Sequence, residues 1–204
     1  SLPGQVIVLH PDEIHDGQAG TEAGFTYRSF HINPELIQAA CGLSTLPFLS
    51  EGVYQDPALV NACKRVILDL DRELSDLEYH ESIQQLSDEF IRLAGDQRRK
   101  KKPKNTKAIQ LAKDYIHQYL NADISMDDLE QHTQCDRWQL ARDFRGITGT
   151  SPYRYLIYQR LNRASQDLLK GCKVVETALQ FGFSDQSHFH RHFKQAFGLT
   201  PKQW

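Results

Sequence analysis

Residues 136–155 read DRWQLARDFRGITGTSPYRY, and residues 185–204 read DQSHFHRHFKQAFGLTPKQW. The second stretch repeats the first without a gap, 49 positions further along (185 − 136). Five pairs are identical: Asp136/Asp185, Arg142/Arg191, Phe144/Phe193, Gly149/Gly198 and Pro152/Pro201. The conservative pairs are Leu140/Phe189, Arg145/Lys194, Ser151/Thr200 and Tyr155/Trp204. This density of gapless agreement indicates two copies of one structural unit.

Both copies have the periodicity of an amphipathic helix with an apolar stripe and a polar stripe. The apolar stripe, predicted to be buried, consists of Leu140, Phe144 and Ile147 in the first copy and Phe189, Phe193 and Phe197 in the second. The opposite stripe, about 160° away in the first copy, is predicted to face outward. It holds Trp138, Ala141, Arg142 and Arg145, and in the second copy Ser187, His190, Arg191 and Lys194.

Start and stop signals bound these helices. Asp136 and Ser184-Asp185 are N-cap residues, and Gly149 and Gly198 suit a left-handed C-cap. A shorter helix precedes each, over 126–132 (after the Ser125 cap) and 174–181, and the joining stretches are as short as helix-turn-helix turns. Residues 152–169 are predicted to form one long helix that links the two copies.

Outward arginines on two repeated helices predict DNA binding. The B-DNA major groove admits a helix, arginine bridges guanine O6 and N7, and an apolar edge meets a thymine methyl. A stiff connector would place the two helices about 34 Å apart, one turn of DNA. The alternatives are a solvated face and a basic module that binds an acidic protein or RNA. Repetition of the arginines disfavours the first. The narrow groove of A-form RNA disfavours an RNA partner, and an acidic protein partner stays open.

The net charge also distinguishes the repeated second half of the chain from the first half. Residues 1–100 hold 8 Lys+Arg against 16 Asp+Glu, and residues 101–204 hold 16 against 10, giving −8 and +6 within a total of −2. A basic second half favours a polyanionic partner for that half alone. The 204 residues, 40% of them hydrophobic, contain no membrane-length apolar run or signal pattern, so we expect a cytoplasmic location.

Few residues in the sequence point to catalysis or metal binding. The four cysteines (Cys41, Cys63, Cys135 and Cys172) form no CxxC pair, which disfavours zinc ligation or a disulfide framework. His188 and His192 have the i, i+4 spacing that can ligate zinc, but a third ligand is not evident, and a helix-surface or phosphate contact is preferred. No nucleophile–base pair or glycine-rich phosphate loop is evident. We therefore expect a protein that is not an enzyme and has no metal or cofactor.

Composition suggests four segments. Residues 97–105 hold six cations and Pro103 and read as a basic linker. Ahead of it lie expected strands at 6–9 and 25–30, within a segment 1–33, and a helical region, 34–96, with two helices in 57–94. Residues 106–204 form the repeated domain. The second helix of 57–94 has a stripe that fits core packing or a subunit seam: Ile83, Leu86, Phe90 and Leu93.

The stretch Gly182–Pro201 closely resembles the signature of the AraC/XylS family of bacterial transcription regulators. The resemblance covers residues 106–204 and implies a mainly α fold, with a seven-helix tandem helix-turn-helix domain that binds double-stranded DNA. It implies base contacts from Arg137, Trp138, Ala141 and Arg142, and from Gln186, Ser187, His190 and Arg191. Arg145 and Lys194 lie one turn further on and are better placed for phosphates.

The front half resembles part of the sensor of such regulators. Residues 6–17 look like the second half of a cupin-like domain, whose first half we expect to be missing before Ser1, and 57–94 look like its following helices. His10 and His15 are reminiscent of cupin metal ligands, but a sensor remnant is the preferred interpretation. The resemblance implies a small-molecule effector, a homodimer through 57–94, RNA polymerase as a partner and a role as an activator.

Overall fold

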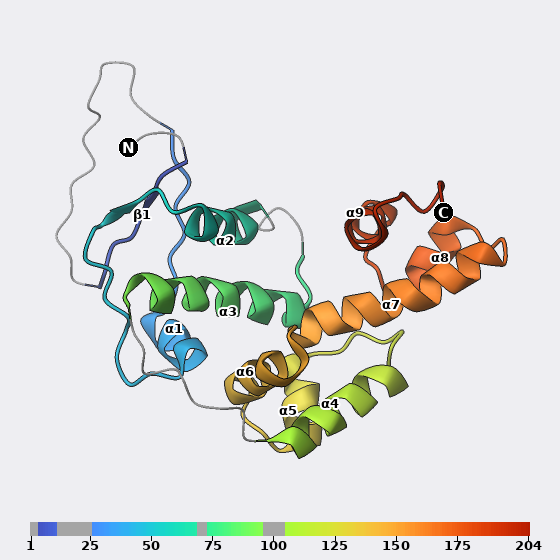
Figure 1. Cartoon of the computed structure of the whole chain (residues 1–204), viewed down its shortest axis with the longest axis horizontal. Helices are drawn as coiled ribbons and strands as arrows, with labels where there is room; N and C mark the ends of the chain where they lie inside the picture. Colours follow the sequence, from blue (N-terminus) through green and yellow to red (C-terminus); the bar gives the residue numbers. More distant parts are fainter. Residues whose placement is uncertain (1–3, 12–25, 69–72, 96–104) are drawn as a thin grey trace. The chain divides into compact units, whose positions relative to one another are not determined.

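The structure is a computed structural model that describes residues 4–11, 26–68, 73–95 and 105–204 (Figure 1). Within these ranges the chain is mainly helical, with nine helices and one pair of short strands. It divides into two compact units. The first unit comprises Ser1–Leu74 and Glu78–Lys101, and the second comprises Ser75–Leu77 and Lys102–Trp204. The expected basic linker lies outside the described residues except for Asn105, whose side chain accepts a hydrogen bond from the Ala108 N–H at the start of α4.

The first unit combines a two-stranded sheet with three helices. Strand β1 (Val6–Ile7) pairs antiparallel with β2 (Val53–Tyr54), so that Val6 faces Tyr54 and Ile7 faces Val53. The helices are α1 (Pro34–Cys41), α2 (Pro57–Leu68) and α3 (Asp76–Leu93). Side chains from the sheet, from the segment before β2 and from α2 and α3 form a core cluster: Leu49, Tyr54, Leu59, Ala62, Cys63 and Leu86, with Val6, Val8, Phe30, Ile32, Phe90 and Leu93 around them.

One expectation for this unit was wrong. Residues 26–30 form no strand, and the partner of β1 is instead Val53–Tyr54, which has no strand pattern in the sequence. A two-residue strand is too short to show an alternating pattern, so only the fold reveals its pairing. Helix α1 lies in the region expected to be helical, and Asn33 caps it by accepting a hydrogen bond from the Glu35 N–H at 2.9 Å.

The two helices expected in 57–94 are confirmed as α2 and α3. Helix α3 begins at Asp76, and α2 ends at Leu68, short of the expected Leu74. Three members of the α3 stripe pack in the core of the first unit: Leu86, Phe90 and Leu93. Core packing therefore accounts for most of that stripe. Arg92 near the end of α3 also pairs with Asp56, the residue that caps α2, at 2.6 Å.

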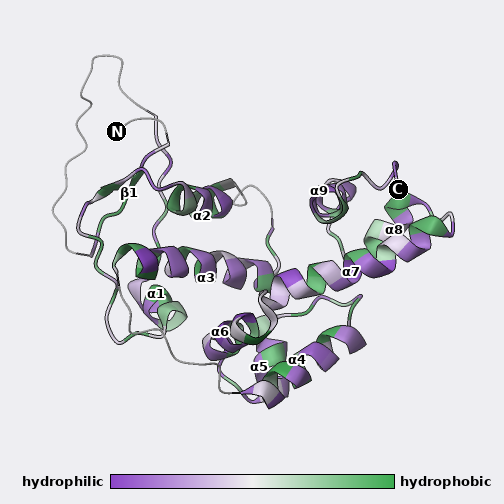
Figure 2. Cartoon of the chain, in the orientation of Figure 1, coloured by the Kyte–Doolittle hydropathy of each residue, from purple (hydrophilic) through white to green (hydrophobic). Residues whose placement is uncertain are grey.

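The second unit is entirely helical. It contains α4 (Thr106–Gln118), α5 (Met126–Thr133), α6 (Arg137–Thr148), α7 (Pro152–Leu169), α8 (Val174–Gln180) and α9 (Gln186–Phe197). Figure 2 shows hydrophilic and hydrophobic residues alternating along α4 and α7, as expected of amphipathic helices that each bury one side. Its core draws on all six helices, with Phe144, Phe189 and Phe193 fully buried.

The resemblance implied seven helices for residues 106–204, and the structure has six. The remaining segment, Thr200–Trp204, makes a single turn, in which the Thr200 carbonyl accepts from the N–H groups of Gln203 and Trp204 at 2.9 and 3.1 Å. One turn fixes several backbone angles for few hydrogen bonds, so it does not amount to a helix.

The internal repeat is confirmed in three dimensions. Helices α6 and α9 each have 12 residues, begin after an aspartate whose side chain accepts from the backbone three residues on, and end at a glycine with φ of 77°. The ring of Tyr155 packs on Phe144 with centroids 5.5 Å apart, and Trp204 packs on Phe193 at 5.7 Å. Equivalent residues of the two copies thus make equivalent contacts.

Candidate nucleic-acid interface

Two helix pairs in the second unit have the order of a helix-turn-helix motif. Residues 134–136 join α5 to α6, and residues 181–185 join α8 to α9. Gln134 has a φ of 53° and Gly182 a φ of 69°, so both turns pass through the left-handed region. The second helix of each pair carries the ten predicted site residues at five equivalent positions: 137/186, 138/187, 141/190, 142/191 and 145/194.

Helix α9 presents its five candidate residues on a largely polar, accessible side. Ser187, Arg191 and Lys194 are exposed, and Gln186 and His190 are half-buried. The amide nitrogen of Gln186 lies 3.4 Å from Nε2 of His190. Phe189 and Phe193 anchor the opposite side of α9 in the core. The helix can therefore present its polar side to a partner without loss of its packing.

Asp185 holds the N-terminus of α9. Its carboxylate accepts from the His188 N–H at 2.7 Å. Hydrogen bonds from the backbone N–H groups of His188 and Ser187, together with the Ser184 hydroxyl, lower the pKa of Asp185 against the opposing effect of burial. Because the charged carboxylate is the better acceptor, this cap is strongest when Asp185 is ionised.

Helix α6 differs from α9 in its electrostatics. Arg137 donates to Glu130 on α5 at 2.9 Å and also pairs with Asp127. Burial lowers the pKa of Arg137, but these two carboxylates outweigh it and raise that pKa overall. The charge of Arg137 is thus largely balanced within the protein, and it attracts a polyanion less than an unmatched cation would.

Arg142 belongs to a short chain of polar contacts on α6. One of its terminal nitrogens lies 3.2 Å from the side-chain oxygen of Gln139, and the Gln139 nitrogen donates to Asp143 at 2.6 Å. These contacts orient the half-buried Arg142 side chain along the helix. Arg145, one turn further, is also half-buried.

Three expectations of exposure on α6 were wrong. Ala141 is only 9% exposed and packs in the core cluster with Leu140 and Phe144. Trp138 is 7% exposed, because removal of its large indole surface from water stabilises the fold by roughly 25 cal/mol per Å². Ile147, expected in the core, is 42% exposed because it lies in the last turn before the Gly149 cap. The side of α6 available to a partner is therefore narrower than the sequence indicates.

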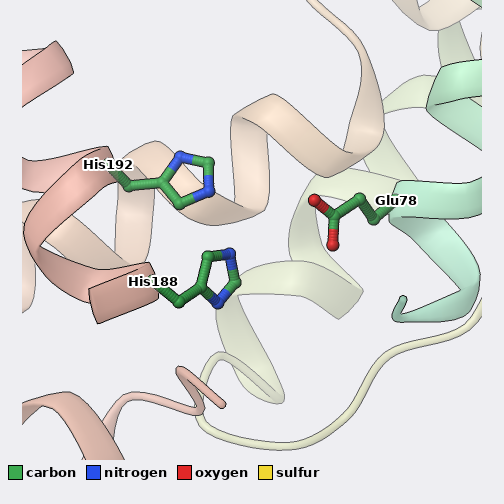
Figure 3. A group of neighbouring side chains, drawn as sticks. All are labelled: Glu78, His188 and His192. Atoms are coloured by element: carbon green, nitrogen blue, oxygen red, sulfur yellow. The ribbon is translucent and has the colours of Figure 1, made fainter. Parts of the chain in front are cut away.

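His188 and His192, drawn in Figure 3, lie one turn apart on α9 with ring centroids 4.6 Å apart. His188 Nδ1 lies 3.1 Å from the Ser184 hydroxyl, and His192 Nε2 lies 3.4 Å from the Tyr153 hydroxyl. Each ring thus has one nitrogen within reach of a hydroxyl of its own unit. Glu78, also labelled there, belongs to the other compact unit. The helix-surface or phosphate contact expected from the sequence for this pair stays a prediction.

His10 in the first unit also has a structural partner. Its Nε2 accepts a hydrogen bond from the Leu49 N–H at 3.1 Å, and its ring stacks on Phe48 with centroids 5.0 Å apart. The nitrogen lone pair that a metal would need is used for that bond. His15 lies outside the described residues.

Among the buried charged residues that sequence reasoning missed is Arg160 on α7, which is 6% exposed. It donates to three backbone carbonyls at 2.6–2.9 Å. The available signal was a cation one position before Leu161 on the apolar side of the long helix. No carboxylate receives any of those three hydrogen bonds.

Paired helix-turn-helix units, with basic residues at matching positions of their second helices, define the second unit as a DNA-binding module of the helix-turn-helix class. A model of the AraC-like ligand binding domain matches residues 1–111, and a helix-turn-helix domain model matches residues 129–204. The chain belongs to the AraC/XylS family of transcription regulators. This is a family of regulators and not of enzymes.

Curated relatives of the chain are regulators by name. The chain is 26% identical over 191 residues to an HTH-type transcriptional regulator, YbfI, of Bacillus subtilis, and the match covers 91% of this chain and 70% of that protein. It is 34% identical over 102 residues to the HTH-type transcriptional regulator ArgR of Pseudomonas aeruginosa, covering 50% of this chain and 30% of the relative. A crystal structure of an AraC-type regulator from Chromobacterium violaceum aligns over 47% of this chain and 87% of its own, with 31% identity and a TM-score of 0.45. Among the described residues, no helix is long and apolar enough to span a membrane.

Proposed function

We propose that this protein is a sequence-specific transcription regulator that reads two successive major-groove segments of DNA with α6 and α9. The observation that carries the proposal is the repeat itself: two 12-residue helices with equivalent caps, equivalent aromatic anchors and arginine at equivalent positions 142 and 191. A helix of this size fits the major groove, and one long connector, α7, links the two copies.

The ten candidate residues take different roles in this proposal. Arg142 and Arg191 contact guanine edges, and Arg145 and Lys194, one turn further, contact phosphates. Gln186, Ser187 and His190 read bases beside Arg191. Arg137, Trp138 and Ala141 occupy the equivalent positions of α6, and the same base-reading role is assigned to them by register. Since Trp138 and Ala141 are buried and Arg137 is paired, we expect α6 to read fewer bases than α9.

The first half is proposed to be the sensor. Its match to the AraC-like ligand binding domain supports a small-molecule effector. In this proposal residues 1–33 are a partial cupin-like segment, 34–96 a helical region and 97–105 a linker before the DNA-binding residues 106–204. We further propose a homodimer through residues 57–94, a cytoplasmic location and contact with RNA polymerase. Activation is favoured over repression, in line with the Providencia stuartii relative, 32% identical over 88 residues, which is named a transcriptional activator.

Selection of bound duplexes from a random DNA pool tests this function directly. We expect the pool to converge on two short elements about one helical turn apart, bound far more tightly than a scrambled duplex. RNA and single-stranded DNA should compete poorly. A pool that never converges, with binding to any duplex that weakens as salt rises, would refute sequence-specific reading.

A further inference from the structure

The long connector α7 buries a cation on its apolar side. Arg160 is 6% exposed, and its neighbours along the helix are buried apolar residues: Leu156, Ile157, Leu161 and Ala164. A charge is seldom buried to this extent unless hydrogen bonds replace its hydration. The hydrogen-bond partners of Arg160 therefore show which parts of the fold this buried charge holds together.

The guanidinium group of Arg160 joins the segment ahead of the first helix-turn-helix unit to the turn of the second. Its Nε donates to the Leu120 carbonyl at 2.9 Å, and one terminal nitrogen donates to the Ala122 carbonyl at 2.6 Å. The other terminal nitrogen donates to the Gly182 carbonyl at 2.9 Å. Leu120 and Ala122 lie between α4 and α5, ahead of the first reading helix, whereas Gly182 lies in the turn that leads into α9. One side chain thus joins the connector to the entry segments of both copies.

At Gly182 the guanidinium of Arg160 occupies the space that a side chain would need. Its φ is 69°, and a Cβ atom at this position would lie 2.9 Å from an Arg160 terminal nitrogen and 3.0 Å from its central carbon. At Gly149 and Gly198, which also have positive φ, an added Cβ would meet no atom within 4 Å. The backbone of the second turn therefore lies directly against the guanidinium.

Arginine suits this position because its N–H donors point in fixed directions within one plane. Three carbonyls from two separate segments can then be held at once. A lysine offers its donors from a single atom and cannot reach all three. Apolar contacts between α7 and the rest of the unit are non-directional, so they supply cohesion but define orientation less strictly than these hydrogen bonds.

We propose that Arg160 is a positioning residue that sets the orientation of α6 relative to α9, and so the spacing of DNA elements that the protein accepts. The inference rests on the proposed function, in which both helices read DNA. When two linked modules are held in the right geometry, the second binds at a high effective concentration. Loss of the three-way contact lowers that advantage while each module still binds its own element.

The test compares wild-type protein with the Arg160→Lys variant on three duplexes derived from the selected site. One carries both elements, one has the second element scrambled, and one has the spacing lengthened by about two base pairs. We expect Arg160→Lys to bind the single-element duplex like wild type but the two-element duplex about tenfold more weakly. We also expect it to discriminate less between the two spacings. Arg163→Lys, at an exposed position of the same helix, is the matched control and should keep the wild-type ratio.

Gly182→Ala provides an independent variant, because it displaces the guanidinium while Arg160 remains. It should lower the ratio of two-element to single-element affinity in the same way. Equal weakening on both duplexes, or an unchanged ratio in Arg160→Lys, would overturn the positioning role. Failure of the proposed function is visible separately in the wild-type protein, which would then bind two elements no more tightly than one.

Discussion

At the scale of single residues, Arg142 and Arg191 are equivalent in register but not in surroundings. Arg142 is half-buried and lies 3.2 Å from Gln139, whereas Arg191 is exposed on α9. Side chains oriented before binding lose less entropy when they meet a base. The two arginines therefore start from different degrees of order, although the repeat assigns them the same role.

Replacement of either arginine by alanine tests that role. If Arg142 or Arg191 grips a guanine, its removal should cost about 1–3 kcal/mol of binding free energy and relax the preference at one base pair. Titration of duplexes that carry each of the four bases at that position measures both effects. Arg163→Ala on α7 serves as the control. The same weakening on every duplex would instead identify a phosphate contact.

The lowered pKa of Asp185 predicts how the free energy of unfolding depends on pH. Its pKa is lowered in the folded protein by the backbone N–H groups at the start of α9, so the unfolded chain binds the proton more readily. The contribution of Asp185 to stability is present above the ordinary aspartate pKa of about 3.9 and disappears as the pH falls through the lower folded-state pKa. Asp185→Asn keeps a good N-cap without this titration.

We therefore expect the free energy of unfolding of Asp185→Asn to fall less steeply on acidification than that of wild type. Denaturant titrations between about pH 5 and pH 3 measure it. Asp114→Asn, in the middle of α4, changes a carboxylate that caps no helix and is the control. Parallel curves for Asp185→Asn and wild type would contradict the prediction.

At the scale of elements, local capping explains why the helices of the second unit begin and end where they do. Ser125 and Asp128 form a reciprocal capping box at the start of α5, and Ser151 with Pro152 starts α7. These signals use residues within one turn of each other, so they are readable in the sequence. The predicted span 152–169 for the connector is confirmed, and the helices at 126 and 174 begin as predicted.

The two C-cap glycines make a matched pair for a test of this equivalence. Gly149 and Gly198 both have φ of 77°, and a Cβ atom would meet nothing within 4 Å at either. Alanine at each should cost only the backbone strain of the left-handed region, about 1–2 kcal/mol of unfolding free energy. Thermal or chemical unfolding of both variants measures it. Clearly unequal losses would show that the repeat is equivalent in pattern but not in energy.

At the scale of the whole molecule, the charge difference between the halves predicts salt-sensitive binding by the basic half. Removal of one cation that binds a phosphate should reduce the slope of log K against log salt concentration by roughly 0.9. We expect Arg145→Ala and Lys194→Ala to lower this slope and weaken binding similarly on selected and scrambled duplexes. Titration at several salt concentrations measures both. If either variant changes base preference at an unchanged slope, that residue reads bases instead.

The sequence by itself determined the repeat, the caps, the connector and the basic side of α9, because each depends on periodicity or on residues close together in the chain. Only the tertiary structure decided which side chains on α6 are buried, since the core cluster that contains Ala141 draws most of its members from other helices. The pairing of β1 with β2 and the bridge from Arg160 to Leu120, Ala122 and Gly182 likewise join residues far apart in the chain. Contacts across such separations leave no periodic trace, because their geometry arises when the helices pack.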